Sequence, residues 1–258
     1  MAAPKESMEK FFRDGFVIVP NVLPRDEALA LRAPLQQAID DDLKTWGSNP
    51  HYIDHWMVHN LMVRGRPFLH LLEHPVMHEY LSAALDEHCV IYAYTTSSMP
   101  PRGANYSRRV HVDSPRVIPG YVTNVGWLLA LDDFTEENGA TYCLPGSQER
   151  LDVPSETEFY GNAVRWLPRA GDAVMFNARL FHAGGENKTD RARHALTMNV
   201  CRSYMRQRFD YPRLVPQDLV DELGPVGRRF LGFNVRVPAS LEEYYVPPEK
   251  RLYLGGQG

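Results

Sequence analysis

The chain has 258 residues, 44% of them hydrophobic, and a formal net charge of -4, which is the composition of an ordinary globular protein. No apolar run reaches the roughly 18 residues that a membrane span needs, and the acidic balance lacks the basic excess typical of nucleic-acid-binding surfaces. The three cysteines, Cys89, Cys143 and Cys201, do not form an even set. Together with an N-terminus that lacks an apolar signal-peptide core, they favour a reducing compartment, and we expect a cytoplasmic protein.

The first third of the chain, residues 1–89, is predicted to be mostly helical. A short helix over 8–14 should end at a glycine and lead into an apolar strand over 16–19. The next helix has apolar residues at a spacing near 3.6, and Pro34 inside this pattern should kink or split it. A further helical stretch is expected over 78–87.

From residue 90 onward the pattern changes to short strands separated by turn residues. Strands are expected over residues 90–96, 121–131, 163–167, 173–176 and 195–201. Helices followed by many short strands indicate an α+β protein with a mainly β core, arranged as a sandwich or barrel. No flexible linker interrupts the chain, so we expect one domain over residues 1–258. No Gly-rich phosphate loop is present to suggest nucleotide chemistry.

The tripeptide His111-Val112-Asp113 is the first candidate for a chemical site. In an extended chain, residues two apart point to the same face, so His111 and Asp113 can bind one ion together. One additional histidine would complete the set of two histidines and one carboxylate that suits non-haem Fe(II). The alternative is a surface turn in which Asp113 caps the following residues.

The third ligand has a candidate in His182, which follows an apolar strand and precedes the small residues 183–185. Arg193 comes eleven residues later and offers a planar guanidinium that can bind a carboxylate through two hydrogen bonds. If Arg193 faces the pocket, the strand alternation places Ala195, Thr197 and Asn199 there as well, with His194 on the opposite face.

The order of His111, Asp113, His182 and Arg193 resembles the phytanoyl-CoA dioxygenase family of Fe(II)/2-oxoglutarate oxygenases. Three other stretches are similar to the family: residues 15–23, 127–139 and 144–148. In the last of these, Gln148 stands in a position where the family usually has histidine. The similarity runs from about residue 10 to about residue 202.

The resemblance implies a double-stranded β-helix, the cupin-like jelly roll, formed by residues 90–202 and flanked by N-terminal helices. It implies catalytic Fe(II) held by His111, Asp113 and His182, with O2 and 2-oxoglutarate as cosubstrates and ascorbate as a candidate reductant. The far carboxylate of 2-oxoglutarate is then expected on Arg193. Trp127 matches a family aromatic near the cosubstrate, and an aromatic that fills the barrel core is the alternative.

The expected reaction is hydroxylation of a small molecule, with specialised metabolism as one setting, coupled to decarboxylation of 2-oxoglutarate to succinate. Halogenating members of the family lack the acidic ligand, so the presence of Asp113 disfavours halogenation. Desaturation, epimerisation and ring formation use the same ligands and stay open. More distant alternatives are a cupin-type metal isomerase or lyase, which would not need Arg193, and a non-catalytic jelly-roll binding protein.

Arginines on both sides of the His-x-Asp motif could attract an anionic substrate, and Arg116 is the candidate among them. The alternative is a solvated loop edge. Residues 203–258 match no family motif, and we expect a lid over the site or a subunit interface there. The oligomeric state is left open.

Overall fold

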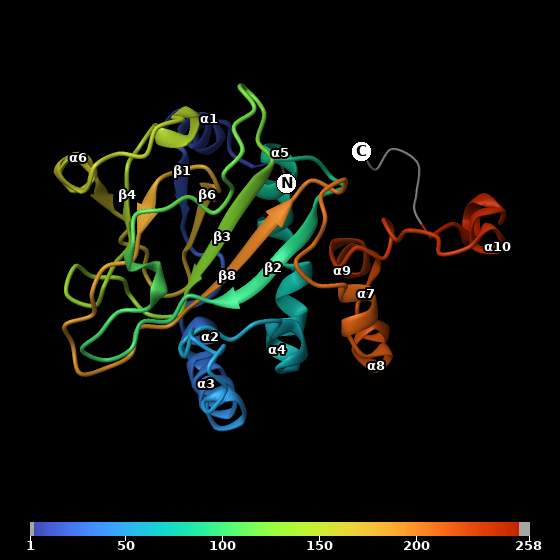
Figure 1. The fold of residues 1–258 in the computed structure, drawn as a ribbon, viewed down its shortest axis with the longest axis horizontal. Helices are drawn as coiled ribbons and strands as arrows, with labels where there is room; N and C mark the ends of the chain where they lie inside the picture. Colours follow the sequence, from blue (N-terminus) through green and yellow to red (C-terminus); the bar gives the residue numbers. More distant parts are fainter. Residues whose placement is uncertain (1–2, 253–258) are drawn as a thin grey trace.

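Eight β-strands form two antiparallel sheets in the computed structural model, which describes residues 3–252 (Figure 1). The larger sheet has five strands in the order β1 (Phe16–Val19), β6 (Ala173–Asn177), β3 (Asn124–Ala130), β8 (Ala195–Cys201) and β2 (Val90–Thr96). The smaller sheet has the order β5 (Val164–Arg165), β4 (Tyr142–Cys143) and β7 (His182–Ala183). The chain crosses repeatedly between the two sheets, which confirms the predicted jelly roll.

Successive side chains of the central strand β3 point to opposite faces of the larger sheet, as the pleat of a strand requires. Trp127 and Leu129 pack into the core that the sheet shares with the helices. Leu128 lies in a second core, with Phe176 and Trp166, between the two sheets. The strand is therefore buried on both faces. One face packs against the helices, and the other contributes to the core between the two sheets.

Helices from the first third of the chain cover the outer face of the larger sheet (Figure 1). They are α1 (Lys5–Asp14), α2 (Arg25–Ala30), α3 (Arg32–Trp46), α4 (Arg66–His70) and α5 (Pro75–Ala84). The predicted split near Pro34 is confirmed, because one helix ends at Ala30 and the next begins at Arg32. Pro34 then lies in the first turn of α3, where its missing N–H leaves no helical bond unmade.

Short elements connect the layers and complete the chain. Between the strands lie α6 (Glu156–Asn162), η1 (Leu61–Val63), η2 (Leu71–Glu73), η3 (Tyr106–Arg108) and η4 (Ser147–Glu149). The C-terminal part holds α7 (Tyr211–Leu214), α8 (Gln217–Asp221), α9 (Pro225–Phe230), α10 (Leu241–Tyr244) and η5 (Pro248–Lys250). Figure 1 shows α7 to α9 grouped beyond β2, while α10 stands away from the body. A role as lid or interface stays a prediction.

The described cysteines are all free and buried, in agreement with the absence of a disulfide framework. Within residues 3–252, no helix combines the length and apolarity that crossing a bilayer requires. The connection from β2 to β3, residues 97–123, contains no strand and only one short helix, η3. This connection carries two of the predicted metal ligands.

Candidate metal centre and its pocket

The structure brings His111, Asp113 and His182 together from two distant parts of the chain. His111 lies in the 97–123 connection and pairs with His182, the first residue of β7, through an isolated antiparallel bridge. The N–H of each histidine donates to the carbonyl of the other at 3.0 Å. The N–H of Asp113 donates to the carbonyl of Ala178 at 2.8 Å, which fixes the carboxylate beside the two rings.

The three side chains present their donor atoms to a common point. Asp113 Oδ1 lies 3.7 Å from Nε2 of His111 and 3.9 Å from Nε2 of His182. Each Nδ1 has its own backbone acceptor, the carbonyl of Arg109 at 2.8 Å for His111 and that of Leu180 at 3.0 Å for His182. Donation from Nδ1 leaves the lone pair on Nε2, so both histidines are oriented as metal ligands usually are.

The protonation state of the cluster also suits a metal. Burial, together with the neighbouring His182 ring, lowers the pKa of His111 to about 4. The imidazole is therefore neutral at neutral pH, which is the form that binds a metal. Two imidazoles and one carboxylate on one side of an ion match the preference of non-haem Fe(II). The donor set therefore fits the iron that the sequence predicts.

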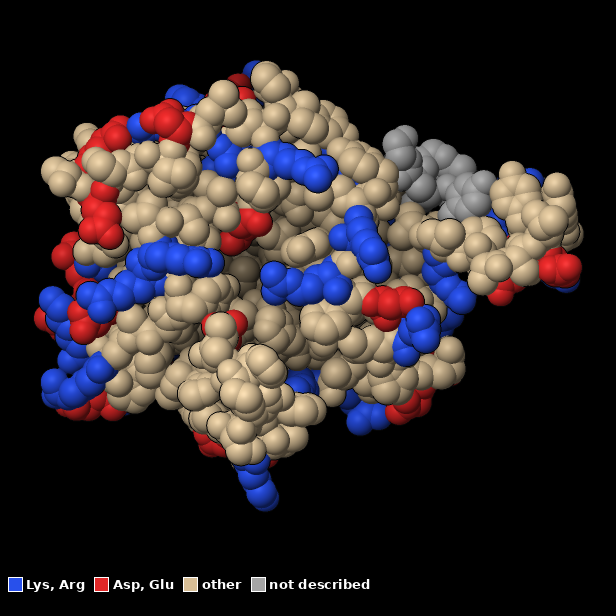
Figure 2. All heavy atoms as spheres, in the orientation of Figure 1, with Lys and Arg blue, Asp and Glu red and all other residues tan. Residues whose placement is uncertain are grey.

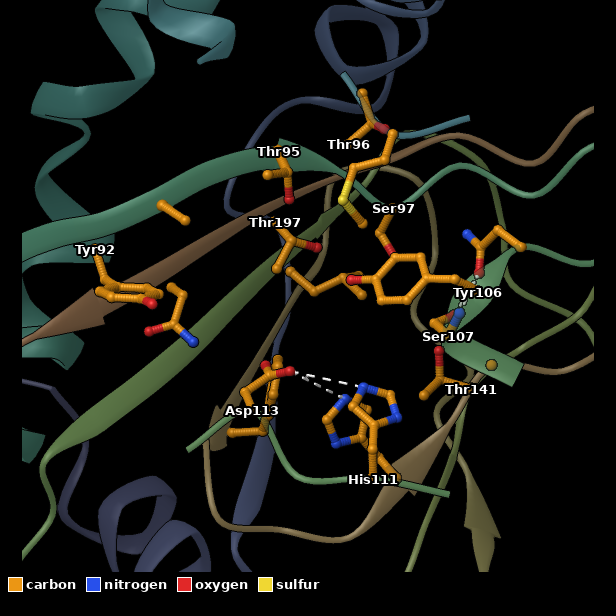
Figure 3. Close-up of a pocket in the computed structure, with 18 of the residues that line it drawn as sticks. Tyr92, Thr95, Thr96, Ser97, Tyr106, Ser107, His111, Asp113, Thr141 and Thr197 are labelled. Atoms are coloured by element: carbon orange, nitrogen blue, oxygen red, sulfur yellow. Dashed lines mark hydrogen bonds and ion pairs between the residues drawn. The ribbon is translucent and has the colours of Figure 1, made fainter. Parts of the chain in front are cut away.

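A cavity of about 140 Å³ lies in front of the cluster and opens at the surface. Figure 3 shows His111 and Asp113 directed into the space that Thr95, Thr197 and Tyr106 border. The space-filling view shows a hollow on this face of the molecule with basic side chains on its rim (Figure 2). Strand β8 contributes to the wall through Thr197 and Asn199. Ala195, which the predicted alternation also places there, packs in the core between the two sheets instead. The following residues line the cavity: Met57, Tyr92, Ala93, Thr95, Thr96, Ser97, Asn105, Tyr106, Ser107, His111, Asp113, Leu128, Thr141, Trp166, Phe176, His182, Gly184, Thr197, Asn199 and Arg208.

Arg193 is a buried cation that lacks an anionic partner. Its side chain is 1% exposed, and its guanidinium donates to the carbonyls of Ser97 and Gly139, both at 3.2 Å. Nε of Arg193 has no partner, and within residues 3–252 no carboxylate forms an ion pair with it. Burial lowers its pKa to about 9. Arg193 does not itself line the cavity, but Ser97, to which it bonds, does. A buried guanidinium bonded only to neutral groups fits a site for a carboxylate.

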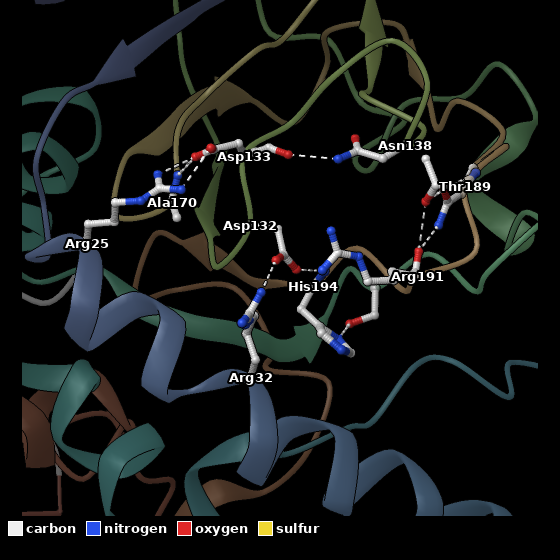
Figure 4. A network of polar contacts seen from close by, with 11 residues as sticks. Arg25, Arg32, Asp132, Asp133, Asn138, Ala170, Thr189, Arg191 and His194 are labelled. Atoms are coloured by element: carbon white, nitrogen blue, oxygen red, sulfur yellow. Dashed lines mark hydrogen bonds and ion pairs between the residues drawn. The ribbon is translucent and has the colours of Figure 1, made fainter.

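The backbone beside Arg193 is tied to the helical layer through an acidic pair (Figure 4). The N–H of His194 donates to Oδ2 of Asp132 at 2.8 Å, and Arg32 of α3 donates to Oδ1 of the same carboxylate at 2.7 Å. Asp133 binds Arg25 of α2 through both of its oxygens. The helices therefore help to fix the backbone at Arg193, two residues before β8 begins.

Two of the predicted site residues lie elsewhere. Trp127 is 2% exposed on the helix-covered face of β3, with its ring centroid 6.1 Å from that of Tyr80. The structure therefore does not bring Trp127 to the cavity, and the alternative of a core aromatic describes its position. Arg116 is exposed and is not among the cavity residues, so the structure does not bring it to the substrate space. Of the other basic residues near the motif, Arg102 pairs with Asp190.

Several cavity residues were not singled out from the sequence as parts of the site. Trp166 stacks towards His182, with ring centroids 6.0 Å apart, and Phe176 contacts the same ring edge-on at 5.3 Å. Tyr92 lies at an irregularity of β2 and also reaches the cavity. An apolar or aromatic residue in a strand carries no signal that separates a cavity wall from a core.

Gly126 provides the space that the Phe176 ring occupies. The two residues face each other across β3 and β6, and a methyl group at position 126 would overlap the ring. We expect Gly126→Ala to push Phe176 towards His182 and to lower the free energy of unfolding by about 1–3 kcal/mol. Urea denaturation measures this change, and Fe(II) titration should show weaker binding. Gly161→Ala, in α6 where the added methyl meets nothing within 4 Å, is the control. An unchanged stability of Gly126→Ala would contradict the tight packing.

Comparisons with known proteins agree with this geometry. The profile of the phytanoyl-CoA dioxygenase (PhyH) family matches residues 11–195. An uncharacterised protein of Mycobacterium tuberculosis is 35% identical over 204 residues, which cover 77% of this chain and 75% of that protein. The dioxygenase sphC of Aspergillus fumigatus is 25% identical over 98% of this chain and 74% of its own length. Among solved structures, the alpha-ketoglutarate-dependent carbocyclase SnoK from nogalamycin biosynthesis aligns with a TM-score of 0.62 and 22% identity, over 83% of this chain and 92% of that chain.

Proposed function

Since the chain belongs to the phytanoyl-CoA dioxygenase family, whose members are iron- and 2-oxoglutarate-dependent oxidoreductases, we propose that it hydroxylates a small molecule in the cytoplasm. The observation that carries this proposal is the His-Asp-His cluster at the cavity together with the buried, unpaired guanidinium of Arg193. A cupin-type isomerase or a non-catalytic binding protein would not need a buried guanidinium to bind the carboxylate of a cosubstrate.

Each residue of the site has a distinct task in this proposal. His111, Asp113 and His182 hold Fe(II) on one side, which leaves positions for the keto acid and for O2. Arg193 binds the far carboxylate of 2-oxoglutarate, since its unpartnered Nε and buried charge are stabilised by an anion. When bound, the iron supplies the activation of O2 that couples decarboxylation of 2-oxoglutarate to oxidation of the substrate.

The walls of the cavity control what reaches the ion. Leu128, Phe176 and Trp166 close its inner side with apolar surface, which keeps bulk water away from the reacting atoms. The hydroxyl of Thr197 is buried without a partner, so it can bond to a polar group of a bound molecule. The atoms balance when one oxygen of O2 enters succinate, the other enters the new hydroxyl group, and CO2 leaves.

The fold alone does not separate hydroxylation from related outcomes, since the similar structure SnoK is named a carbocyclase. We propose hydroxylation as the outcome, and the presence of Asp113 in the carboxylate position disfavours halogenation. The chemical structure of the product distinguishes desaturation, epimerisation and cyclisation from hydroxylation.

The proposal is tested by screening small molecules for 2-oxoglutarate-dependent O2 uptake and then following the isotope from 18-O2. We expect succinate to form in near-stoichiometric amount with product, and we expect label in both. Label in succinate alone would indicate desaturation or ring closure. Added chloride should never enter the product, because Asp113 fills the position a halide would need. Turnover of the true substrate without 2-oxoglutarate would indicate that the protein is an isomerase or a lyase instead.

A further inference from the structure

One basic residue of the cavity has no task in the proposed function. Arg208 lines the cavity, yet it follows β8 and belongs to the C-terminal part of the chain. Its side chain is exposed, and within residues 3–252 no carboxylate forms an ion pair with it. Its neighbours in the chain differ in this respect, because Arg202 pairs with Asp86 and Arg213 with Asp210. Arg208 is therefore a cation available to a ligand.

A bulge in β2 holds Arg208 in place. The register between β2 and β8 shifts between Ile91 and Ala93, so that Tyr92 and Ala93 both line the cavity. The carbonyl of Tyr92 accepts the N–H of Arg208 at 3.0 Å and the hydroxyl of Tyr211 at 3.2 Å. The guanidinium of Arg208 lies 5.6 Å from the centre of the Tyr92 ring. The backbone that carries the cation is thus fixed to the sheet.

Arg208 and Arg193 reach the site from opposite ends. The guanidinium of Arg193 donates to the carbonyl of Ser97, whereas the guanidinium of Arg208 lies near the ring of Tyr92. Five residues of extended chain separate Tyr92 from Ser97, which is about 16 Å at the rise of a β-strand. Figure 3 shows these two residues at opposite ends of the β2 stretch, with Asp113 below and between them. A diacid as short as 2-oxoglutarate that is held by Arg193 leaves Arg208 unoccupied.

We propose that Arg208 is the anchor for a carboxylate of the substrate, which makes the substrate an organic acid with an apolar body. This inference rests on the proposed function and names the substrate class of the same site. The guanidinium offers two parallel donors, the geometry that a carboxylate matches. The cavity wall also includes apolar residues, among them Met57, Ala93 and Leu128. The acid therefore binds at the rim, and its carbon skeleton extends towards the metal.

The test compares the binding of matched acids and amides. Phenylacetate and octanoate are titrated against phenylacetamide and octanamide, with the Fe(II)- and 2-oxoglutarate-loaded protein kept anaerobic and followed by calorimetry. We expect at least one acid to bind about tenfold or more tightly than its amide, since a bond to a charged group is lost in the amide. Arg208→Gln should remove this preference, and Arg208→Lys should keep part of it. Arg206→Gln, an exposed arginine two positions away that does not line the cavity, is the control.

The outcomes separate this inference from the proposed function. If the parent protein forms no complex with Fe(II) and 2-oxoglutarate, the proposed function fails. If the complex forms but no acid binds more tightly than its amide, or the preference survives in Arg208→Gln, the anchor is wrong. Preference for phenyl phosphate over phenylacetate overturns the carboxylate assignment. Weaker binding of 2-oxoglutarate itself to Arg208→Gln would assign Arg208 to the cosubstrate instead.

Discussion

Replacing His182 with alanine is expected to abolish Fe(II)-dependent activity and the weak visible band of a metal-chelated keto acid. Residues that merely orient a metal ligand typically contribute 10–100-fold in affinity, so losing a ligand should weaken Fe(II) binding by at least about 100-fold. The loss is specific to the side chain, because the backbone bonds between positions 182 and 111 do not depend on it. Anaerobic titration with Fe(II) in the presence of 2-oxoglutarate measures the effect.

A stability control is needed because the His182 ring also packs against Trp166. His78→Ala removes a histidine that contacts Phe230 in the helical layer, with ring centroids 4.9 Å apart, and that does not line the cavity. This variant should lose stability and keep its affinity for iron. Should His182→Ala bind Fe(II) as well as the parent does, the third ligand has been misassigned.

Replacing Arg193 with methionine is expected to raise the apparent constant for 2-oxoglutarate by roughly 30-fold or more while leaving iron binding largely intact. Removing one partner of a desolvated charge pair costs about 2–5 kcal/mol, which sets this range. Without 2-oxoglutarate, the variant loses a buried cation that has no anionic partner, so its stability should change less than its affinity. The rise in melting temperature that 2-oxoglutarate gives the parent should disappear.

Arg202→Met is the matched control for this experiment. Arg202 follows β8 directly in the chain, and it already donates to Asp86 at 2.8 Å and to the carbonyl of Val122 at 2.8 Å. Its replacement should leave the dependence on 2-oxoglutarate unchanged. The assignment of Arg193 is refuted if Arg202→Met raises the apparent constant for 2-oxoglutarate and Arg193→Met leaves it unchanged.

Only the His111 and Asp113 part of the metal cluster has a geometry that is local in the sequence. His111 and Asp113 are two residues apart in extended chain, and the spacing alone places them on one side. His182 and Arg193 needed the resemblance to a family, since the bridge that joins positions 111 and 182 is a tertiary contact. Strands of two residues, such as β4 and β7, are too short to show any alternation.

Other parts of the site depend on contacts that no local pattern contains. The sequence leaves two positions open for Trp127, because β3 is buried on both faces and hydrophobicity does not indicate which face meets the cavity. Arg116 was chosen for its closeness to Asp113 in the chain, but the exposed loop that follows the motif carries it outward. The position of Arg208 depends on the bulge at Tyr92, which sequence periodicity does not reveal.

The long connection between β2 and β3 gives an ion at this site a role as a cross-link. His111 and Asp113 in the connection lie about 70 residues before His182 in the smaller sheet. An ion bound by all three residues would close a loop of that length. Tyr106 and Ser107, which form part of the cavity wall, belong to the same connection. A bound metal would therefore tie the part of the cavity wall that this connection forms to the smaller sheet.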